Sequence, residues 1–208
     1  MRANKKEALI ETAAKHFSKK GYAVTTLDEI AKDVGITKPA IYYHFKDKEA
    51  LYNAVVMSRL KVVARRLETA CEGAHGAVGK LDTYIETFGA FMAEYPCFAA
   101  ILAREFANNG IHLDDDATKT LARTLHLVTQ IVNEGVKEGV FAVENPMVVQ
   151  MMVVTTLIMH QTTAKLRERV VAFVPDAYEI LPDPSIDDYA KQLALKMHRC
   201  LLNIKERS

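Results

Sequence analysis

Side chains that can bind phosphate groups and the edges of nucleic-acid bases gather in one short stretch of the chain. Between residues 37 and 48, hydroxyl, ammonium and imidazole groups follow one another closely: Thr37, Lys38, Tyr42, Tyr43, His44 and Lys48. Such groups donate hydrogen bonds to phosphate oxygens, and from a helix surface they also reach base edges in the major groove. The stretch therefore indicates contact with a polyanion.

Positive charge is likewise concentrated in the N-terminal part of the chain. Residues 1–66 contain fourteen Lys and Arg against seven Asp and Glu, a net charge of +7. Residues 67–208 contain thirteen against nineteen, a net charge of −6, so the total of +1 hides the difference. A basic front part on an acidic body indicates that the front part meets nucleic acid.

Short helices must position these side chains. A first helix, with Leu9 and Phe17 on its inner side, is expected to stop at Gly21, which suits the left-handed position after a helix end. Thr26 and Glu29 have the spacing of a capping box and begin a second helix. Gly35 ends that helix and starts a tight turn.

The third helix follows this turn at once. Thr37 is expected to cap it, with Pro39 in the first turn, where a missing N–H costs nothing. Ile41 and Phe45 lie four residues apart and anchor the helix, which turns the polar residues between them towards other faces. Two short helices around a glycine turn are the pattern of a helix-turn-helix DNA reader.

The rest of the chain reads as helical as well. Asp47 caps a fourth helix to about residue 72, roughly 36 Å long, and Gly73, Gly76 and Gly79 then form a short flexible crossing. Apolar residues recur at three and four through helices expected over 80–95, 97–108, 114–138 and from Pro146. The predicted fold is all-α: three N-terminal helices joined by a long helix to a helical C-terminal body.

The sequence gives little support for catalysis, cofactor binding or metal binding. There is no nucleophile elbow, P-loop, dinucleotide fingerprint or metal-binding His/Glu pair, so no catalytic residue, no cofactor and no metal ligand is predicted. Cys71, Cys97 and Cys200 are scattered and odd in number, which argues against disulfides. The acidic run 114–116 is interpreted as a complement to a helix dipole rather than a cation site.

Two C-terminal segments are typical of a dimer interface. Residues 147–159 are apolar apart from Gln150, Thr155 and Thr156. The last helix has an apolar seam at spacings of three and four: Ile186, Tyr189, Leu193, Met197, Cys200 and Ile204. Packing of both segments inside one monomer is the alternative, but a two-fold partner covers them more easily. Residues 174–184 are expected to form an irregular loop.

The N-terminal quarter resembles the TetR/AcrR family of bacterial transcription regulators. The matching residues are Phe17, Gly21, Tyr22, Thr25, Thr26, Ile30, Ala31, Gly35 to Lys46, Lys48, Glu49 and Leu51. Beyond residue 70 the resemblance is one of architecture only. It implies a DNA-binding domain over 1–47 and an effector-binding and dimerisation domain over 48–208, with dimer helices at about 146–169 and 186–205.

The resemblance also implies site residues. Thr26 would bond a phosphate, Thr37, Lys38, Pro39, Ala40 and Tyr42 would lie in the major groove of double-stranded DNA, Tyr43 and His44 near its edge, and Lys48 on the backbone. The effector side chains would be Tyr84, Phe88, Phe91, Met92, Phe98, Ile101, Leu125, His126, Met152 and His160. Each of these, taken singly, is also consistent with plain core.

The resulting hypothesis is a homodimeric repressor that an apolar small molecule releases from a palindromic operator. An activator of the same fold, or an architectural DNA-binding protein without an effector, are the alternatives. No segment reads as a signal peptide or as a membrane span, so the expected compartment is the cytoplasm.

Overall fold

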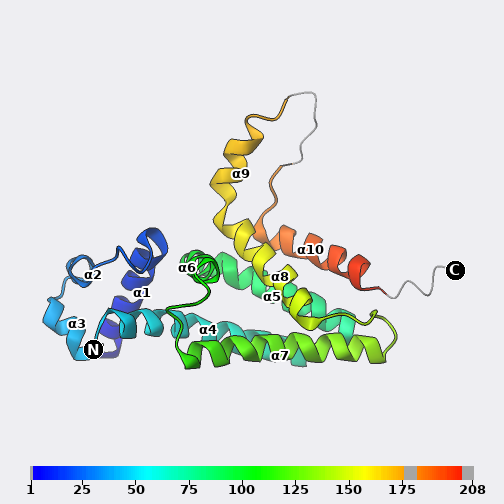
Figure 1. The fold of residues 1–208 in the computed structure, drawn as a ribbon, viewed down its shortest axis with the longest axis horizontal. Helices are drawn as coiled ribbons and strands as arrows, with labels where there is room; N and C mark the ends of the chain where they lie inside the picture. Colours follow the sequence, from blue (N-terminus) through cyan, green and yellow to red (C-terminus); the bar gives the residue numbers. More distant parts are fainter. Residues whose placement is uncertain (1, 176–181, 203–208) are drawn as a thin grey trace. The chain divides into compact units, whose positions relative to one another are not determined.

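The computed structural model describes residues 2–175 and 182–202, in which ten α-helices and no strand occur. The helices are α1 (Arg2–Lys20), α2 (Leu27–Val34), α3 (Lys38–His44), α4 (Lys48–Glu72), α5 (Gly76–Glu94), α6 (Pro96–Ala107), α7 (Asp115–Lys137), α8 (Pro146–Thr162), α9 (Ala164–Val171) and α10 (Ile186–Leu201) (Figure 1). The all-α prediction is confirmed. No single helix in these ranges is long and apolar enough to cross a bilayer.

Packing divides the chain into two compact units. The head unit consists of residues 1–62 and 97–121, and the body unit of the described residues among 63–96 and 122–208. The head unit thus contains α1, α2 and α3 together with the first part of α4, nearly all of α6 and the first part of α7. The division at residue 47 concerns function rather than packing and stays a prediction.

The head unit is built on the anchors expected from the sequence. Helix α2 packs against both α1 and α3. Leu9, Ile30, Ile41 and Leu51 are fully buried, and Phe17 is 1% exposed. Each comes from a different helix except Leu9 and Phe17, which share α1. The small core therefore joins all three helices of the reader to the start of α4.

The predicted helix ends are confirmed in atomic detail. Gly21 and Gly35 have φ angles of 81° and 74°, in the left-handed region that glycine adopts without strain. Asp47 Oδ1 accepts a hydrogen bond from the Ala50 N–H at 2.8 Å and so caps α4. Asp114 Oδ1 caps α7 through the Ala117 N–H at the same distance.

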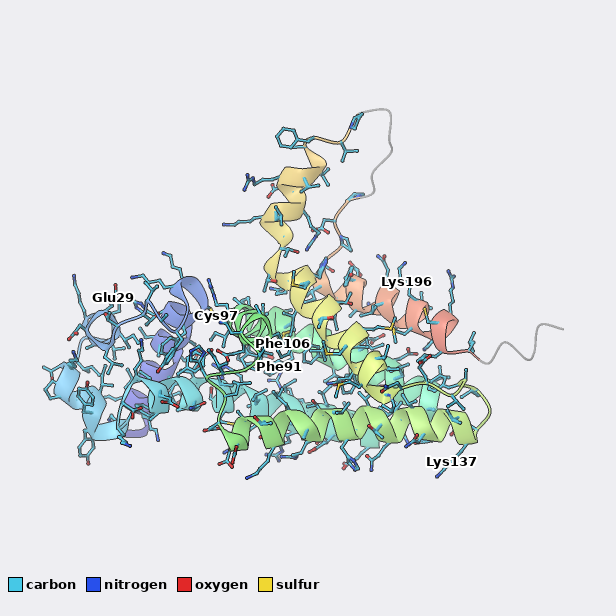
Figure 2. All side chains as sticks on the ribbon, viewed as in Figure 1. Glu29, Phe91, Cys97, Phe106, Lys137 and Lys196 are labelled. Carbon is cyan, nitrogen blue, oxygen red and sulfur yellow. The ribbon has the colours of Figure 1, made fainter. Side chains whose placement is uncertain are left out.

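The body unit centres on α5, which packs against α8 and α10 (Figure 1). Its inner residues are buried as predicted: Leu81, Tyr84, Ile85, Phe88, Phe91 and Met92. Phe91 is labelled among the side chains in Figure 2. From the other helices, Val128 of α7, Val153 of α8 and Ala194 of α10 contribute buried side chains.

Two helix boundaries differ from the prediction. Gly76 and Gly79 are the first and fourth residues of α5, so the crossing shrinks to residues 73–75, because a glycine at a helix start costs too little to break it. The helix expected over 146–169 is two helices, α8 and α9, with a break at Thr163. The Arg167 guanidinium donates a hydrogen bond to the His160 carbonyl at 2.7 Å, which stabilises the bend between the two helices.

The predicted seam of α10 is partly wrong. Leu193 is 8% exposed and Met197 is 1% exposed, because this side of α10 packs against α5 and α8 inside one protomer. The exposed face carries Leu195 and Lys196 instead, and Lys196 is labelled in Figure 2. Periodicity located the apolar stripe correctly but not what covers it. Ile204 lies outside the described residues.

The close approach of α5 and α10 generates a stability prediction. A Cβ atom on Gly89 would lie 2.8 Å from the Cβ of Ala190, and neither atom can rotate away. Gly89→Ala should therefore lower the free energy of unfolding by about 1–3 kcal/mol. Gly79→Ala is the matched control, since nothing lies within 4 Å of its Cβ position on the same helix.

The control should raise the free energy of unfolding, by up to about 1 kcal/mol, because alanine favours the helix over glycine. Urea unfolding followed by circular dichroism measures both variants. Effects of the same sign would contradict the α5–α10 packing described here.

Candidate nucleic-acid interface

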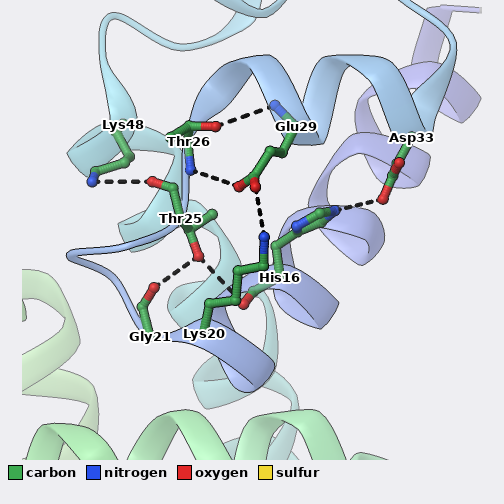
Figure 3. Close-up of polar contacts among 8 residues, drawn as sticks. All are labelled: His16, Lys20, Gly21, Thr25, Thr26, Glu29, Asp33 and Lys48. Carbon is green, nitrogen blue, oxygen red and sulfur yellow. Dashed lines mark hydrogen bonds and ion pairs between the residues drawn. The ribbon is translucent and has the colours of Figure 1, made fainter.

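The start of α2 is a complete capping box. Thr26 Oγ1 accepts a hydrogen bond from the Glu29 N–H, and Glu29 Oε2 accepts one from the Thr26 N–H, both at 3.3 Å (Figure 3). Lys20 adds an ion pair to Glu29 Oε1 at 2.6 Å. Thr26 is exposed, so the residue that begins α2 is held in place and still faces solvent.

The turn from α2 to α3 leaves one hydroxyl unused. The Ile36 N–H donates to the Ala31 carbonyl at 3.0 Å, which closes the end of α2 around Gly35. Thr37 then takes the N-cap position of α3 as predicted, but its side chain makes no capping hydrogen bond. Because Thr37 is also exposed, its hydroxyl can serve a partner outside the protein.

Helix α3 separates an anchoring face from a solvent face. Ile41 is fully buried and Phe45, which follows the helix, is 7% exposed, whereas Tyr42 and Tyr43 are 49% and 73% exposed. Two large exposed aromatic rings on seven residues indicate a surface made for contact. Of the other predicted residues, Pro39 is exposed, and Ala40 and His44 are half-buried.

Lys38 does not stand free at the start of α3. Its ammonium forms an ion pair with Asp28 of α2 at 2.8 Å, and that hydrogen bond raises the pKa of Lys38. The side chains of Lys38 and Asp28 are 41% and 67% exposed, and ion pairs in such positions exchange with water at little cost. Lys38 is therefore available to a base edge once it leaves Asp28.

The Lys48 ammonium makes its contacts within the head unit, and its predicted contact with the DNA backbone stays a prediction. Its ammonium donates to three carbonyl oxygens of the α1–α2 loop, those of Tyr22, Ala23 and Thr25, at 2.9, 3.3 and 3.2 Å. It also lies 4.4 Å from the centre of the Tyr22 ring. An ammonium group has three N–H donors, and all three have acceptors here, so we assign Lys48 to holding this loop.

Sequence reasoning missed Lys46 as a candidate phosphate contact. Lys46 is exposed and lies between the end of α3 and the Asp47 cap of α4. The signal was the run Lys46-Asp47-Lys48: Asp47 caps α4 and Lys48 bonds the α1–α2 loop, whereas Lys46 makes no hydrogen bond or ion pair with the residues that the structure describes. Which lysine holds the loop depends on contacts across more than twenty residues, and spacing alone does not reveal them.

Eight of the ten predicted effector residues belong to the body unit and two to the head unit. Tyr84, Phe88, Phe91 and Met92 are core residues of the body unit, whereas Phe98 and Ile101 are buried in the head unit. Leu125 is half-buried, and His126 and Met152 are exposed. The Tyr84 hydroxyl bonds Gln150 at 2.9 Å, and Gln150 bonds Thr124 at 3.3 Å, so this part of the core has polar partners.

Two pockets of the body unit lie elsewhere. One of about 420 Å³ is lined by residues of α4, α5, α7 and the loop after α4: Glu68, Cys71, Glu72, Ala74, Lys80, Leu127, Gln130, Ile131 and Glu134. A second, of about 430 Å³, includes His160, which stacks on Tyr189 at 4.0 Å. Burial, with the Arg167 charge second, lowers the pKa of His160, which favours its neutral form. Of the ten predicted residues, only His160 lines either pocket.

Comparison with known proteins supports the interpretation of the N-terminal helices as a helix-turn-helix domain. Residues 9–55 match the family model described as bacterial regulatory proteins, tetR family. The chain is 44% identical over 70 residues to the uncharacterized HTH-type transcriptional regulator YerO of Bacillus subtilis (strain 168), and 49% identical over 51 residues to IcaR of Staphylococcus aureus (strain Newman), a negative transcriptional regulator of the biofilm operon icaADBC. These matches cover 30% and 24% of this chain, and only 24% and 27% of those proteins.

Solved structures extend the likeness to the whole fold. A tetR-family regulatory protein from Rhodococcus RHA1 matches with a TM-score of 0.74 at 18% identity, covering 94% of this chain and 95% of that one. FadR from Bacillus subtilis, solved in complex with stearoyl-CoA, matches with a TM-score of 0.72 at 18% identity, covering 91% and 95%. At these identities the likeness concerns the fold alone.

The fold and the N-terminal helices together define a class of protein in which a helix-turn-helix domain precedes a helical body. Within that class, residues 9–55 match the N-terminal domain of the tetR family of bacterial regulatory proteins, and the chain shares its fold with solved tetR-family proteins.

The capping box of α2 generates a pH prediction. The hydrogen bond from Lys20, and after it the one from the Thr26 N–H, hold the pKa of Glu29 below its ordinary value of 4.5. A carboxyl group with a lowered folded-state pKa adds stability above its unfolded pKa and loses it as the pH falls through the folded value. Relative to Glu29→Gln, the native protein should thus be more stable near pH 7, and this advantage should shrink as the pH falls below 4.5.

Urea unfolding at a series of pH values between 7 and 3 measures the difference. Lys20→Met, which removes the ammonium but keeps the carboxyl group, should shrink the pH dependence in the same way. A difference between native protein and Glu29→Gln that stays constant across the range would contradict the role given to this ion pair.

Proposed function

We propose that this protein is a sequence-specific regulator of transcription that binds double-stranded DNA through α2 and α3. The observation that carries the proposal is the division of α3 into two faces. Ile41 and Phe45 bury one face, while Tyr42, Tyr43 and the start of the helix at Lys38 remain open to solvent. A helix held in this way can enter the major groove without losing its support.

The roles of the side chains follow from their chemistry and exposure. The hydroxyls of Thr26 and Thr37 and the ammonium of Lys46 are suited to phosphate oxygens, which position the reader. Lys38 and Tyr42 are suited to base edges, with Pro39 and Ala40 in van der Waals contact and Tyr43 and His44 near the groove edge. Most of the affinity then comes from phosphates, and one or two side chains set the sequence.

We further propose that the protein acts as a homodimer. A seven-residue helix reaches few base edges, so one copy binds weakly and two copies are needed about one DNA turn apart. The body unit offers a surface for this. Large apolar side chains between 46% and 89% exposed occur on α8, on α9 and just after α9: Met147, Val148, Met151, Met159, Leu166, Val170, Val171 and Phe173.

The charges on α10 suit an antiparallel pair of these helices. Asp187 and Asp188 lie in its first turn, while Lys196 and Arg199 lie towards its end, and all four are exposed. A two-fold axis between two copies of α10 brings the acidic end of one copy against the basic end of the other. This supports a partner of the same chain.

Repression and release by an apolar small molecule complete the proposal. IcaR, the relative with the 49% match, is a negative regulator, and FadR was solved with stearoyl-CoA, a ligand with a long apolar chain. The aromatic core of α5 is a suitable surface for such a chain. Because this core is closed here, binding must separate helices of the body unit, and DNA and effector then weaken each other's binding to the same extent.

Two lysines test the division of roles in the head. Lys46→Ala should weaken binding to every DNA sequence by a similar factor and reduce the slope of log affinity against log salt concentration by about one, as for a lost phosphate contact. Lys38→Ala should instead change which bases are preferred. Fluorescence anisotropy with a small set of operator variants at several salt concentrations measures both effects.

Lys48→Ala is the comparison that the structure adds. Because its ammonium holds three carbonyls, this variant should lower the melting temperature more than Lys46→Ala does. Equal melting temperatures and equal salt slopes for the two variants would contradict the assignment.

The most direct test of the whole proposal is selection of bound DNA from a random pool. We expect a palindromic site whose half-sites are spaced for two α3 helices on one face of the duplex. Sedimentation of the complex should give two chains per site. A selected pool without any common sequence would favour an architectural DNA-binding protein over a regulator.

A further inference from the structure

A buried carboxyl group lies at the end of α6 in the head unit. Glu105 is 1% exposed. Its Oε1 accepts a hydrogen bond from the Tyr52 hydroxyl of α4 at 2.5 Å and lies 3.0 Å from Nδ1 of His112, in the loop after α6. Its Oε2 accepts one from the His112 N–H at 3.4 Å. One carboxyl group thus fixes two aromatic side chains from separate segments.

Both of these side chains support the same tyrosine ring. The Tyr22 ring, in the α1–α2 loop, lies 4.4 Å from the His112 ring and 5.0 Å from the Tyr52 ring, between ring centres. Phe17 completes the group with an edge contact to Tyr52 at 4.9 Å. Aromatic pairs at these separations add stability beyond the area that they bury.

Tyr22 in turn supports the lysine that holds the loop. The Lys48 ammonium lies over its ring and bonds the carbonyls of residues 22, 23 and 25, in the loop that leads to Thr26. Figure 3 shows the bond to Thr25. Next to Glu105, the Arg104 guanidinium donates to the Lys19 carbonyl at 3.4 Å, in the last turn of α1. The end of α6 and the loop after it therefore contact both the α1–α2 loop and the end of the helix that precedes it.

We infer that Glu105 is a positioning residue of the DNA reader: through Tyr52, His112 and Tyr22 it fixes the loop that sets the place of Thr26 and the start of α2. This inference rests on the proposed function, since it concerns how the reader is aligned with DNA. Glu105 itself is buried and does not touch the nucleic acid.

Physical cost supports a geometric role for this carboxyl group. Burying a carboxylate is expensive unless hydrogen bonds replace its water, and an apolar side chain would fill the space at less cost. Three directed contacts specify positions that apolar packing leaves adjustable. Burial, together with the bond to Glu105, raises the pKa of the Tyr52 hydroxyl, so this group remains a donor at any physiological pH.

The test compares two buried side chains that each lose a hydroxyl group. Tyr52→Phe keeps the ring contacts with Phe17 and Tyr22 but removes the bond to Glu105. Thr120→Val is the control: Thr120 of α7 is 6% exposed, and its hydroxyl donates to the Asp116 carbonyl at 2.8 Å. Glu105→Gln and Glu105→Ala form a second pair, because glutamine keeps an acceptor oxygen for Tyr52 and alanine does not.

Two quantities are measured on the full chain: affinity for the selected operator, and amide hydrogen exchange by mass spectrometry. We expect Tyr52→Phe to weaken operator binding by about tenfold and to speed exchange at residues 22–26. Thr120→Val should lower the melting temperature but leave both quantities unchanged. Glu105→Gln should lose less affinity than Glu105→Ala.

The outcomes separate this inference from the proposed function. If the native protein binds no DNA sequence selectively, the proposed function fails, and exchange at residues 22–26 still decides whether Glu105 fixes the loop. If the native protein binds and Tyr52→Phe matches it in affinity and exchange, the inference is overturned. A loss of affinity as large in Thr120→Val would overturn it too, because the effect would then reflect general stability.

Discussion

A helix of seven residues is unstable in water by itself, because the cost of nucleation exceeds the gain from so few hydrogen bonds. Helix α3 is such a helix, and most features of the head unit can be understood as supplying what it lacks. Ile41 and Phe45 give it a core, and Gly35 brings it directly off α2. Asp47 starts α4 immediately afterwards, so the helix is held at both ends.

The sequence predicted those features that depend on neighbours in the chain. The capping box of Thr26 and Glu29, the left-handed Gly35 and the cap at Asp47 each involve residues within a few positions of one another. Their chemistry is therefore visible in the spacing. The core positions of α1, α2 and α3 were predictable for a related reason, since a short amphipathic helix has only one apolar face to bury.

Features that depend on distant partners were not predictable in the same way. The acceptors of Lys48 lie 23 to 26 residues away, and its charge alone suggested a phosphate instead. Periodicity placed Leu193 and Met197 on one face of α10, but that face meets α5 in the same protomer. Glu105 carried no signal at all, because a glutamate in a helix is ordinarily on the surface.

The head unit is not a continuous piece of chain, since residues 97–121 belong to it as much as residues 1–62 do. This has a consequence for the evolution and engineering of such proteins. A reader transplanted from this chain onto another body by a single crossover after α4 would leave Glu105 and His112 behind. Natural recombination and designed chimeras alike must exchange α6 and its following loop together with the first helices, so a new DNA specificity is inherited through two segments and not one.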